Sequence, residues 1–200
     1  MNVRAKTFLN NLLRRTDHAR WRVPDSLNPA WDSRTAAIAQ FVPAGTRVIE
    51  FGAGRRQLET HLDASCAYFP SDIIMREPGM LVCDLNVRPL PDLGRLELDV
   101  AVFSGVLVYV ADLPAIAKWL SGCVSLCVAS YACATTRTHS VSRFRESLAR
   151  TREGWINTFS QKEVEQIFRQ AGFYCCHTTD WQHQTIFLFR KVNEIDRPLT

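Results

Sequence analysis

The sequence predicts a doubly wound α/β fold: a Rossmann-like, mostly parallel sheet of seven strands with an antiparallel last strand. Apolar runs of strand length alternate with helical patterns along the chain. Several of these runs are apolar throughout, as is typical of parallel strands covered on both faces. The last two runs have no helix between them, so they must pair as an antiparallel hairpin.

The seven expected strands are separated by turn signals or helical patterns. The first is β-branched and is followed at once by Gly52-Ala53-Gly54, which predicts a tight turn into a helix. The last two are joined by a turn around residues 180–183. The expected strands span residues 46–51, 66–69, 80–83, 99–103, 124–129, 173–179 and 185–190.

Four helices are expected from apolar periodicity and end signals. Asp112 is a suitable N-cap, with Pro114 in the first turn that follows. Ser160 and Glu163 form a capping-box pattern, and Gly172 ends that helix. Residues 21–31 are expected to form a loop because prolines interrupt regular structure there. The expected helices span residues 35–42, 57–62, 112–120 and 160–172.

Length and composition predict one globular domain with an appended arm. Of the 200 residues, 46% are hydrophobic and 22% are charged, which excludes disordered, collagen-like and coiled-coil chains. We expect a basic, partly helical arm or cap over residues 1–40 and the main domain over 41–200. Residues 135–155 interrupt the strand and helix alternation, so they are a candidate lid insertion. The net charge of +4 is too small for a dedicated nucleic-acid binder.

The sequence also bears on location and metal content. No apolar run reaches the length of a membrane span, and the first residues lack the pattern of a secretory signal, so we expect a cytoplasmic protein. The seven cysteines are then expected to be reduced. None of them shows the paired Cys-x2-Cys spacing of a zinc site, so no metal is expected.

The polar residues at the ends of the first two strands predict a ligand site. Ligands of such sheets bind at the carboxyl ends of the strands, where the strand order reverses. Gly52 and Gly54 allow close backbone approach, and Asp72, twenty residues past Gly52, is placed to accept hydrogen bonds from a ribose diol. Glu50 suits a ligand with an ammonium group, whereas Gln57 replaces the last glycine of the dinucleotide motif. The pattern favours a ribose-containing ligand with a cationic tail, and a nicotinamide-dependent reductase remains the alternative.

Five segments together resemble the class I S-adenosylmethionine-dependent methyltransferases. Val48-Ile-Glu-Phe-Gly-Ala-Gly54 is similar to the first motif of that family, and Ser71-Asp72-Ile73 resembles its ribose-binding acidic segment. Cys83-Asp84-Leu85-Asn86 resembles the loop that contacts adenine. The segment 99–112 resembles the fourth strand with the loop that lines the reaction centre, and 160–173 the late helix. The resemblance covers residues 40–190.

The resemblance implies S-adenosyl-L-methionine as cofactor and S-adenosyl-L-homocysteine as product. It implies that the methionine part is surrounded by Glu50, Gly52, Gly54 and Ser104. Asp72 would bind the ribose. Asp84 would accept a hydrogen bond from the adenine amino group, and Leu85 would pack on the adenine ring. Tyr109 and His139 are expected to face the transferred methyl. Residues 1–22 of the arm and the lid insertion are expected to cover the site, with an arginine that fixes an anionic acceptor. The methyl group is expected to go to an oxygen or nitrogen of this small-molecule or saccharide-like acceptor.

Three positions depart from the family pattern. Arg56 stands at the third glycine of the first motif, and Tyr109 stands where the small-molecule branch often has histidine. The Pro-Gly-Gly turn before the fifth strand is absent, and Ser121-Gly122-Cys123 occupies its place. The first two departures lie at the cofactor pocket, so a non-catalytic binding subunit with the same fold is a further alternative. The acceptor, the methylated atom and the oligomeric state are left open.

Overall fold

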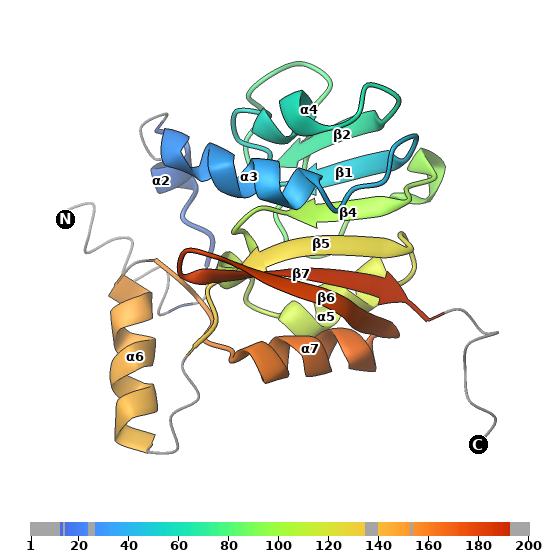
Figure 1. Ribbon diagram of the computed structural model, residues 1–200. Helices are drawn as coiled ribbons and strands as arrows, with labels where there is room; N and C mark the ends of the chain where they lie inside the picture. The colour runs from blue at the N-terminus through green and yellow to red at the C-terminus, as the bar shows by residue number, and fades with distance from the viewer. Residues whose placement is uncertain (1–12, 14, 24–26, 135–139, 153, 193–200) are drawn as a thin grey trace, which may run out of the picture.

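The structure, a computed structural model, describes residues 13, 15–23, 27–134, 140–152 and 154–192. These residues form a seven-stranded sheet in the order β3-β2-β1-β4-β5-β7-β6 (Figure 1). Its strands are β1 (Arg47–Phe51), β2 (Ala67–Asp72), β3 (Leu81–Val82), β4 (Val100–Phe103), β5 (Leu126–Tyr131), β6 (Phe173–Trp181) and β7 (Gln184–Lys191).

The strand pairing confirms the predicted doubly wound topology. β1 pairs in parallel with both β2 and β4, β2 pairs in parallel with β3, and β4 with β5. β7 is antiparallel to both of its neighbours, β5 and β6. The strand order therefore reverses between β1 and β4, and this reversal fixes where the loops diverge at the carboxyl edge.

The helices follow the predicted positions closely, and the described residues contain five further helical segments. The four predicted helices correspond to α3 (Asp32–Ala39), α4 (Gln57–His61), α5 (Leu113–Leu120) and α7 (Gln161–Gln170). Asp112 caps α5, and the capping box at the start of α7 is complete. The helix α6 was not predicted from the sequence. The other helical segments are α2 (His18–Trp21), η2 (Pro29–Trp31), η3 (Gly94–Leu96), η4 (Leu107–Tyr109) and α6 (Ser140–Arg152).

The expected loop over residues 21–31 is only partly correct. Pro29 opens η2 rather than breaking it, because the first residue of a helix needs no amide hydrogen. The Asn28 side chain caps this turn by accepting from the Ala30 amide at 3.0 Å. Proline in this stretch thus marks the start of a helical turn that leads directly into α3.

Two apolar layers enclose the sheet, one on each face. α3 and α4 cover one face, where Ile38 and Leu58 pack with alternate strand residues such as Val48. α5 and α7 cover the other face, where the core includes Ile49 and Phe168 (Figure 1). Because neighbouring strand residues point to opposite faces, both must be apolar in a strand covered twice. Within the described ranges, no helix has the length and apolar character needed to cross a membrane.

Asn157 joins the loop before α7 to the segment that follows β4. Its Nδ2 donates to the backbone oxygens of Leu107 and Val110, both at 2.7 Å. Its Oδ1 accepts from the Tyr131 hydroxyl, which in turn accepts from the Phe159 amide at 2.9 Å. Asn157 is 4% exposed, so these groups have little access to water. This network fixes η4 over the end of the sheet.

We predict that Asn157→Ala lowers the free energy of unfolding by about 3 kcal/mol, because two buried carbonyl oxygens lose their donor. Tyr131→Phe should cost less, about 1–2 kcal/mol, because it removes one hydroxyl and leaves the Asn157 amide in place. Urea denaturation measures both changes. Ser33→Ala, which removes one exposed helix-surface contact, is the control. Equal free energies of unfolding for Asn157→Ala and this control would contradict the stabilising role of Asn157.

Candidate functional site

The loop after β1 is built so that backbone can approach closely. Gly52 has a φ of 72°, and a Cβ there would lie 2.5 Å from a methyl group of Val106. The Ala53 amide donates to the Ser71 backbone oxygen, and the Gly54 amide donates to Oδ2 of Asp72 at 2.9 Å. The glycine loop is therefore tied to the end of β2, and a side chain at position 52 would collide with Val106.

A cavity of about 520 Å³ opens at this carboxyl edge of the sheet. Its volume lies in the range of small-molecule and cofactor sites. The cavity brings together all of the predicted cofactor residues and the predicted catalytic tyrosine: Glu50, Gly52, Gly54, Asp72, Asp84, Leu85, Ser104 and Tyr109.

Asp72, the last residue of β2, is held rigidly in the cavity wall. It is 5% exposed, and Oδ1 accepts from the Ile74 amide at 3.2 Å while Oδ2 accepts from Gly54. Nε of Arg76 lies 3.6 Å from Oδ2. Two backbone donors and a nearby guanidinium orient the carboxylate at the point where the sequence predicted a ribose contact.

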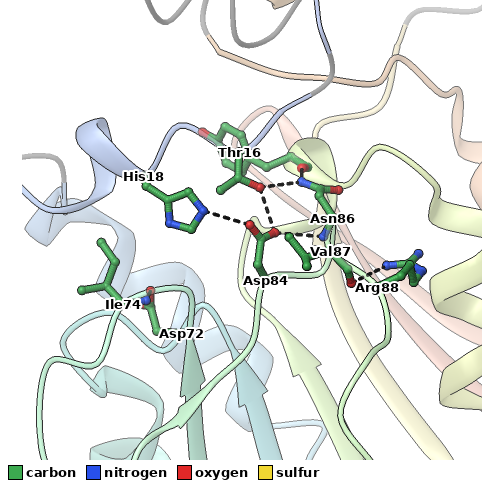
Figure 2. A network of polar contacts seen from close by, with 9 residues as sticks. Thr16, His18, Asp72, Ile74, Asp84, Asn86, Val87 and Arg88 are labelled. Atoms are coloured by element: carbon green, nitrogen blue, oxygen red, sulfur yellow. Dashed lines mark hydrogen bonds and ion pairs between the residues drawn. The ribbon is translucent and has the colours of Figure 1, made fainter.

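Asp84 follows β3 and receives two contacts from the chain before α3. The Thr16 hydroxyl donates to Oδ1 at 2.8 Å, and Nε2 of His18 lies 3.0 Å from Oδ2 (Figure 2). The backbone amide of Asn86 also donates to Oδ1, at 2.9 Å. Sequence reasoning placed Asp84 in the site but did not find these partners, because nothing in the spacing links residues so far apart.

Glu50 is buried on the floor of the cavity. Its side chain accepts a 2.6 Å hydrogen bond from the Tyr68 hydroxyl, and the residue is 2% exposed. Burial raises the pKa of Glu50 to about 8, because the charged form loses its water; the Tyr68 hydrogen bond and Arg34 act in the opposite direction. A carboxyl group with a shifted pKa in a cavity is typical of a functional site.

Arg34, on α3, is a cavity residue that the sequence reading missed. It is 5% exposed, its Nη2 donates to the Ser104 backbone oxygen at 3.0 Å, and burial lowers its pKa to about 10. Within the described residues its Nε has no hydrogen-bond partner. Arg34 stands directly before the apolar helical stretch 35–42. This position was the available signal, because a buried arginine needs a partner or a ligand.

The two predicted catalytic residues have different outcomes. Tyr109, in η4, lines the cavity and contacts the Trp21 ring edge-to-face at 5.1 Å between centroids. His139 lies outside the described residues. Trp155 and His183 also line the cavity, from the segment after α6 and from the β6–β7 turn. These residues surround the cavity from elements other than those that hold the predicted cofactor residues.

The arginine at the third glycine position does not line the cavity. Arg56 adopts a left-handed conformation with a φ of 58°, which is the backbone geometry that glycine would supply. Its guanidinium pairs with Glu59 at 2.8 Å and with Glu77 at 2.7 Å. The expectation that this departure touches the pocket is therefore wrong for its side chain, which is held by surface carboxylates.

A sequence comparison identifies the family. The sequence profile of the family described as "Methyltransferase domain" matches residues 20–178. The chain belongs to this family. The resemblance found in the motifs is thereby confirmed, and the matched range contains all of the predicted cofactor residues. None of the curated protein sequences compared with this methyltransferase-domain chain matches it significantly.

Solved structures share the fold of this methyltransferase-domain chain. Mitomycin 7-O-methyltransferase has a TM-score of 0.61 at 13% identity, over 84% of this chain and 56% of that one. Human N-acetylserotonin methyltransferase, solved with S-adenosylmethionine, has a TM-score of 0.63 at 13% identity, over 93% and 59%. An O-methyltransferase family 2 protein from Planctomyces limnophilus, solved with apigenin, has a TM-score of 0.58 at 15% identity, over 92% and 66%. The chain thus spans little more than half the length of the first two.

We predict that Glu50 lowers the stability of the methyltransferase domain as pH rises. The folded pKa of about 8 exceeds the ordinary value of 4.5, so the folded state binds more protons between these values. Stability contributed by the neutral carboxyl is complete below the lower value and declines through the higher one, at a slope of up to about 1.4 kcal/mol per pH unit. Urea denaturation of the wild type and Glu50→Gln, from about pH 5 to about pH 8.5, measures this difference.

Glu165→Gln, on the exposed side of α7, is the matched control for this measurement. Its stability curve should run parallel to that of the wild type. Parallel curves for wild type and Glu50→Gln would show instead that Glu50 is ionised across the range.

Proposed function

We propose that this chain is an S-adenosylmethionine-dependent methyltransferase that acts on an oxygen or nitrogen of a small acceptor. One observation carries the proposal: a single cavity holds acceptors for an adenosine and opposite charges for an amino acid. Asp72 ends β2 and Asp84 follows β3, whereas Glu50 lies in β1 and Ser104 in the loop after β4. Along the order β3-β2-β1-β4, the nucleoside side and the amino-acid side are adjacent.

The residues present fit this cofactor. A Cβ at Gly52 would collide with Val106, so glycine at this position lets the loops after β1 and β4 approach each other where both border the cavity. The guanidinium of Arg34, a residue that lines the cavity, offers donors for a carboxylate, and Glu50 offers a carboxyl for an ammonium. Asp72 and Asp84 would hold the ribose and the adenine amino group. When bound, the cofactor supplies a methyl group already activated on a sulfonium.

The chain's own residues then have to align the acceptor and exclude water. Alignment of two reacting groups can supply about 7–11 kcal/mol of the barrier. Tyr109 forms part of the wall on which an acceptor would lie, and we propose His139 as the residue that takes the acceptor proton. A positioned base adds about 10²–10⁴-fold to the rate when the acceptor is a hydroxyl.

The acceptor is proposed to be a small, anionic or saccharide-like molecule. Two of the similar structures are named for O-methylation, and one of these is solved with apigenin, so small organic acceptors suit this fold. Arg20, Trp21 and Trp155 line the cavity, and these side chains suit flat or anionic groups. We propose that residues 1–22 and 135–155 form a lid over this acceptor, with an arginine of the lid fixing its anionic group.

We predict that Asp72→Ala weakens binding of S-adenosylhomocysteine by about 10–100-fold, because the ribose loses hydrogen bonds to a charged group. Isothermal titration measures the dissociation constant. Asp92→Ala, at an exposed turn away from the cavity, should leave it unchanged. Tight binding of NADH by the wild type with no binding of S-adenosylhomocysteine would replace the proposal with the reductase alternative.

A second prediction separates the two ends of the cavity. Arg34→Gln should weaken the binding of S-adenosylhomocysteine by about tenfold or more, because the carboxylate of the ligand loses a charged donor. It should leave binding of 5′-methylthioadenosine, which lacks the amino-acid part, nearly unchanged. Asp72→Ala should weaken both ligands. Equal losses for both ligands in Arg34→Gln would show that Arg34 acts on the fold of the site instead of on the amino-acid end.

A further inference from the structure

Residues 15–23, here called the strap, are attached directly to Asp84 and, through Arg76, to Asp72, the two carboxylates assigned to the adenosine. At its first attachment, Thr16 and His18 approach the Asp84 carboxylate on its two oxygens, at 2.8 Å and 3.0 Å (Figure 2). The Asp84 side chain is 12% exposed, whereas that of His18 is 46% exposed. The strap therefore covers Asp84 and leaves its own outer surface in water.

The second attachment leads to Asp72. Nη2 of Arg76 donates to the Trp21 backbone oxygen at 2.7 Å, and Nε of the same arginine lies 3.6 Å from Oδ2 of Asp72. The Trp21 ring also contacts the Tyr109 ring edge-to-face. Thr16, Arg20 and Trp21 all line the cavity. The strap thus crosses the cavity between the acidic residues at the ends of β2 and β3.

Asn86 connects the strap to the reaction-side loop. Its Nδ2 donates to the Thr16 hydroxyl at 3.0 Å and to the Tyr109 backbone oxygen at 2.8 Å. Its Oδ1 accepts from the Ala111 amide at 2.7 Å. One amide side chain therefore links the strap, the loop after β3 and the segment around η4, all of which border the same cavity.

We propose that the strap closes over the adenosine half of the cofactor and is coupled to it through Asp84, with Thr16 and Asn86 as positioning residues; this rests on the proposed function. A carboxylate has about four acceptor sites. The Thr16 hydroxyl and the backbone amide of Asn86 occupy both sites of Oδ1, and His18 occupies one site of Oδ2. One site remains for the adenine amino group, so strap and adenine share Asp84 without displacing each other.

The coupling follows from this shared carboxylate. A cofactor beneath the strap can enter or leave only when the contacts of Thr16, His18 and Trp21 open. A ligand that binds the closed form more tightly shifts the strap towards closure, by linkage. Bound S-adenosylhomocysteine should therefore protect the strap, and a weakened strap should release the ligand faster.

Limited proteolysis of the full chain tests the coupling directly. The strap contains Arg15, Arg20 and Arg22, so trypsin can cut it, and mass spectrometry counts the cuts. We expect saturating S-adenosylhomocysteine to slow these cuts by about tenfold in the wild type, because cleavage follows the population of the open form. Thr16→Val keeps the size of the side chain but removes its hydroxyl, and it should abolish most of this protection.

Release kinetics provide the second readout. Thr16→Val should raise the dissociation rate constant of S-adenosylhomocysteine by about tenfold, the amount expected for one lost hydrogen bond to a charged group. Thr16→Ser should restore the wild-type rate. Thr46→Val is the matched control, because its hydroxyl donates to the Pro43 backbone oxygen just before β1, and neither residue lines the cavity. A residue that merely orients Asp84 would change the release rate but not the tryptic cuts.

Each outcome has a distinct meaning. Protection of the strap in the wild type, its loss in Thr16→Val and its return in Thr16→Ser support the coupling. If S-adenosylhomocysteine binds but leaves the cuts after Arg15, Arg20 and Arg22 unchanged, the strap proposal is overturned and the proposed function stands. If S-adenosylhomocysteine does not bind at all, the proposed function fails and the strap proposal fails with it.

Discussion

The reversal of strand order between β1 and β4 is the constraint on which the site depends. The chain leaves β1 towards one side of the sheet and leaves β4 towards the other, so the loops after these strands diverge and open a crevice. The glycine loop borders the crevice from one side and η4 from the other. Because Gly54 is bonded to Asp72, and Asn157 holds η4, the two borders are fixed independently of each other.

The sequence predicts the parts of this fold that depend on local physics. Capping boxes, helix-ending glycines and doubly apolar strands are governed by neighbours along the chain, so Ser160 and Glu163 mark the start of α7 correctly. The shared location of the candidate cofactor residues is also predictable, because strand ends meet at one edge once the strands are known. All of the predicted set converges on one cavity.

The missed residues act through contacts between distant segments. The hydroxyl of Thr16 and the carboxylate of Asp84 are separated by 68 positions, and no periodic pattern encodes such a pair. Arg34 looks like an ordinary surface residue in a short helix until the β6–β7 turn and the loop after β4 are packed around it, where Gln184 and Ser104 contact it. Sequence reasoning finds residues that an element places, but not partners that only the tertiary fold brings together.

Glu50 and Arg34 explain why this cavity suits an amino-acid ligand on electrostatic grounds. Burial disfavours the charged form of each group, raising the pKa of Glu50 and lowering that of Arg34. A ligand that carries an ammonium and a carboxylate would bring each of them an opposite charge within the same low-dielectric space, where such attraction is stronger than in water. At neutral pH, Glu50 is mostly protonated because its pKa is about 8, so it gives up its proton when the ammonium binds. Arg34 keeps its charge and has already lost its water in the folded protein. For Arg34, binding therefore adds a favourable contact without a further desolvation cost, which is the advantage of a site organised before its ligand arrives.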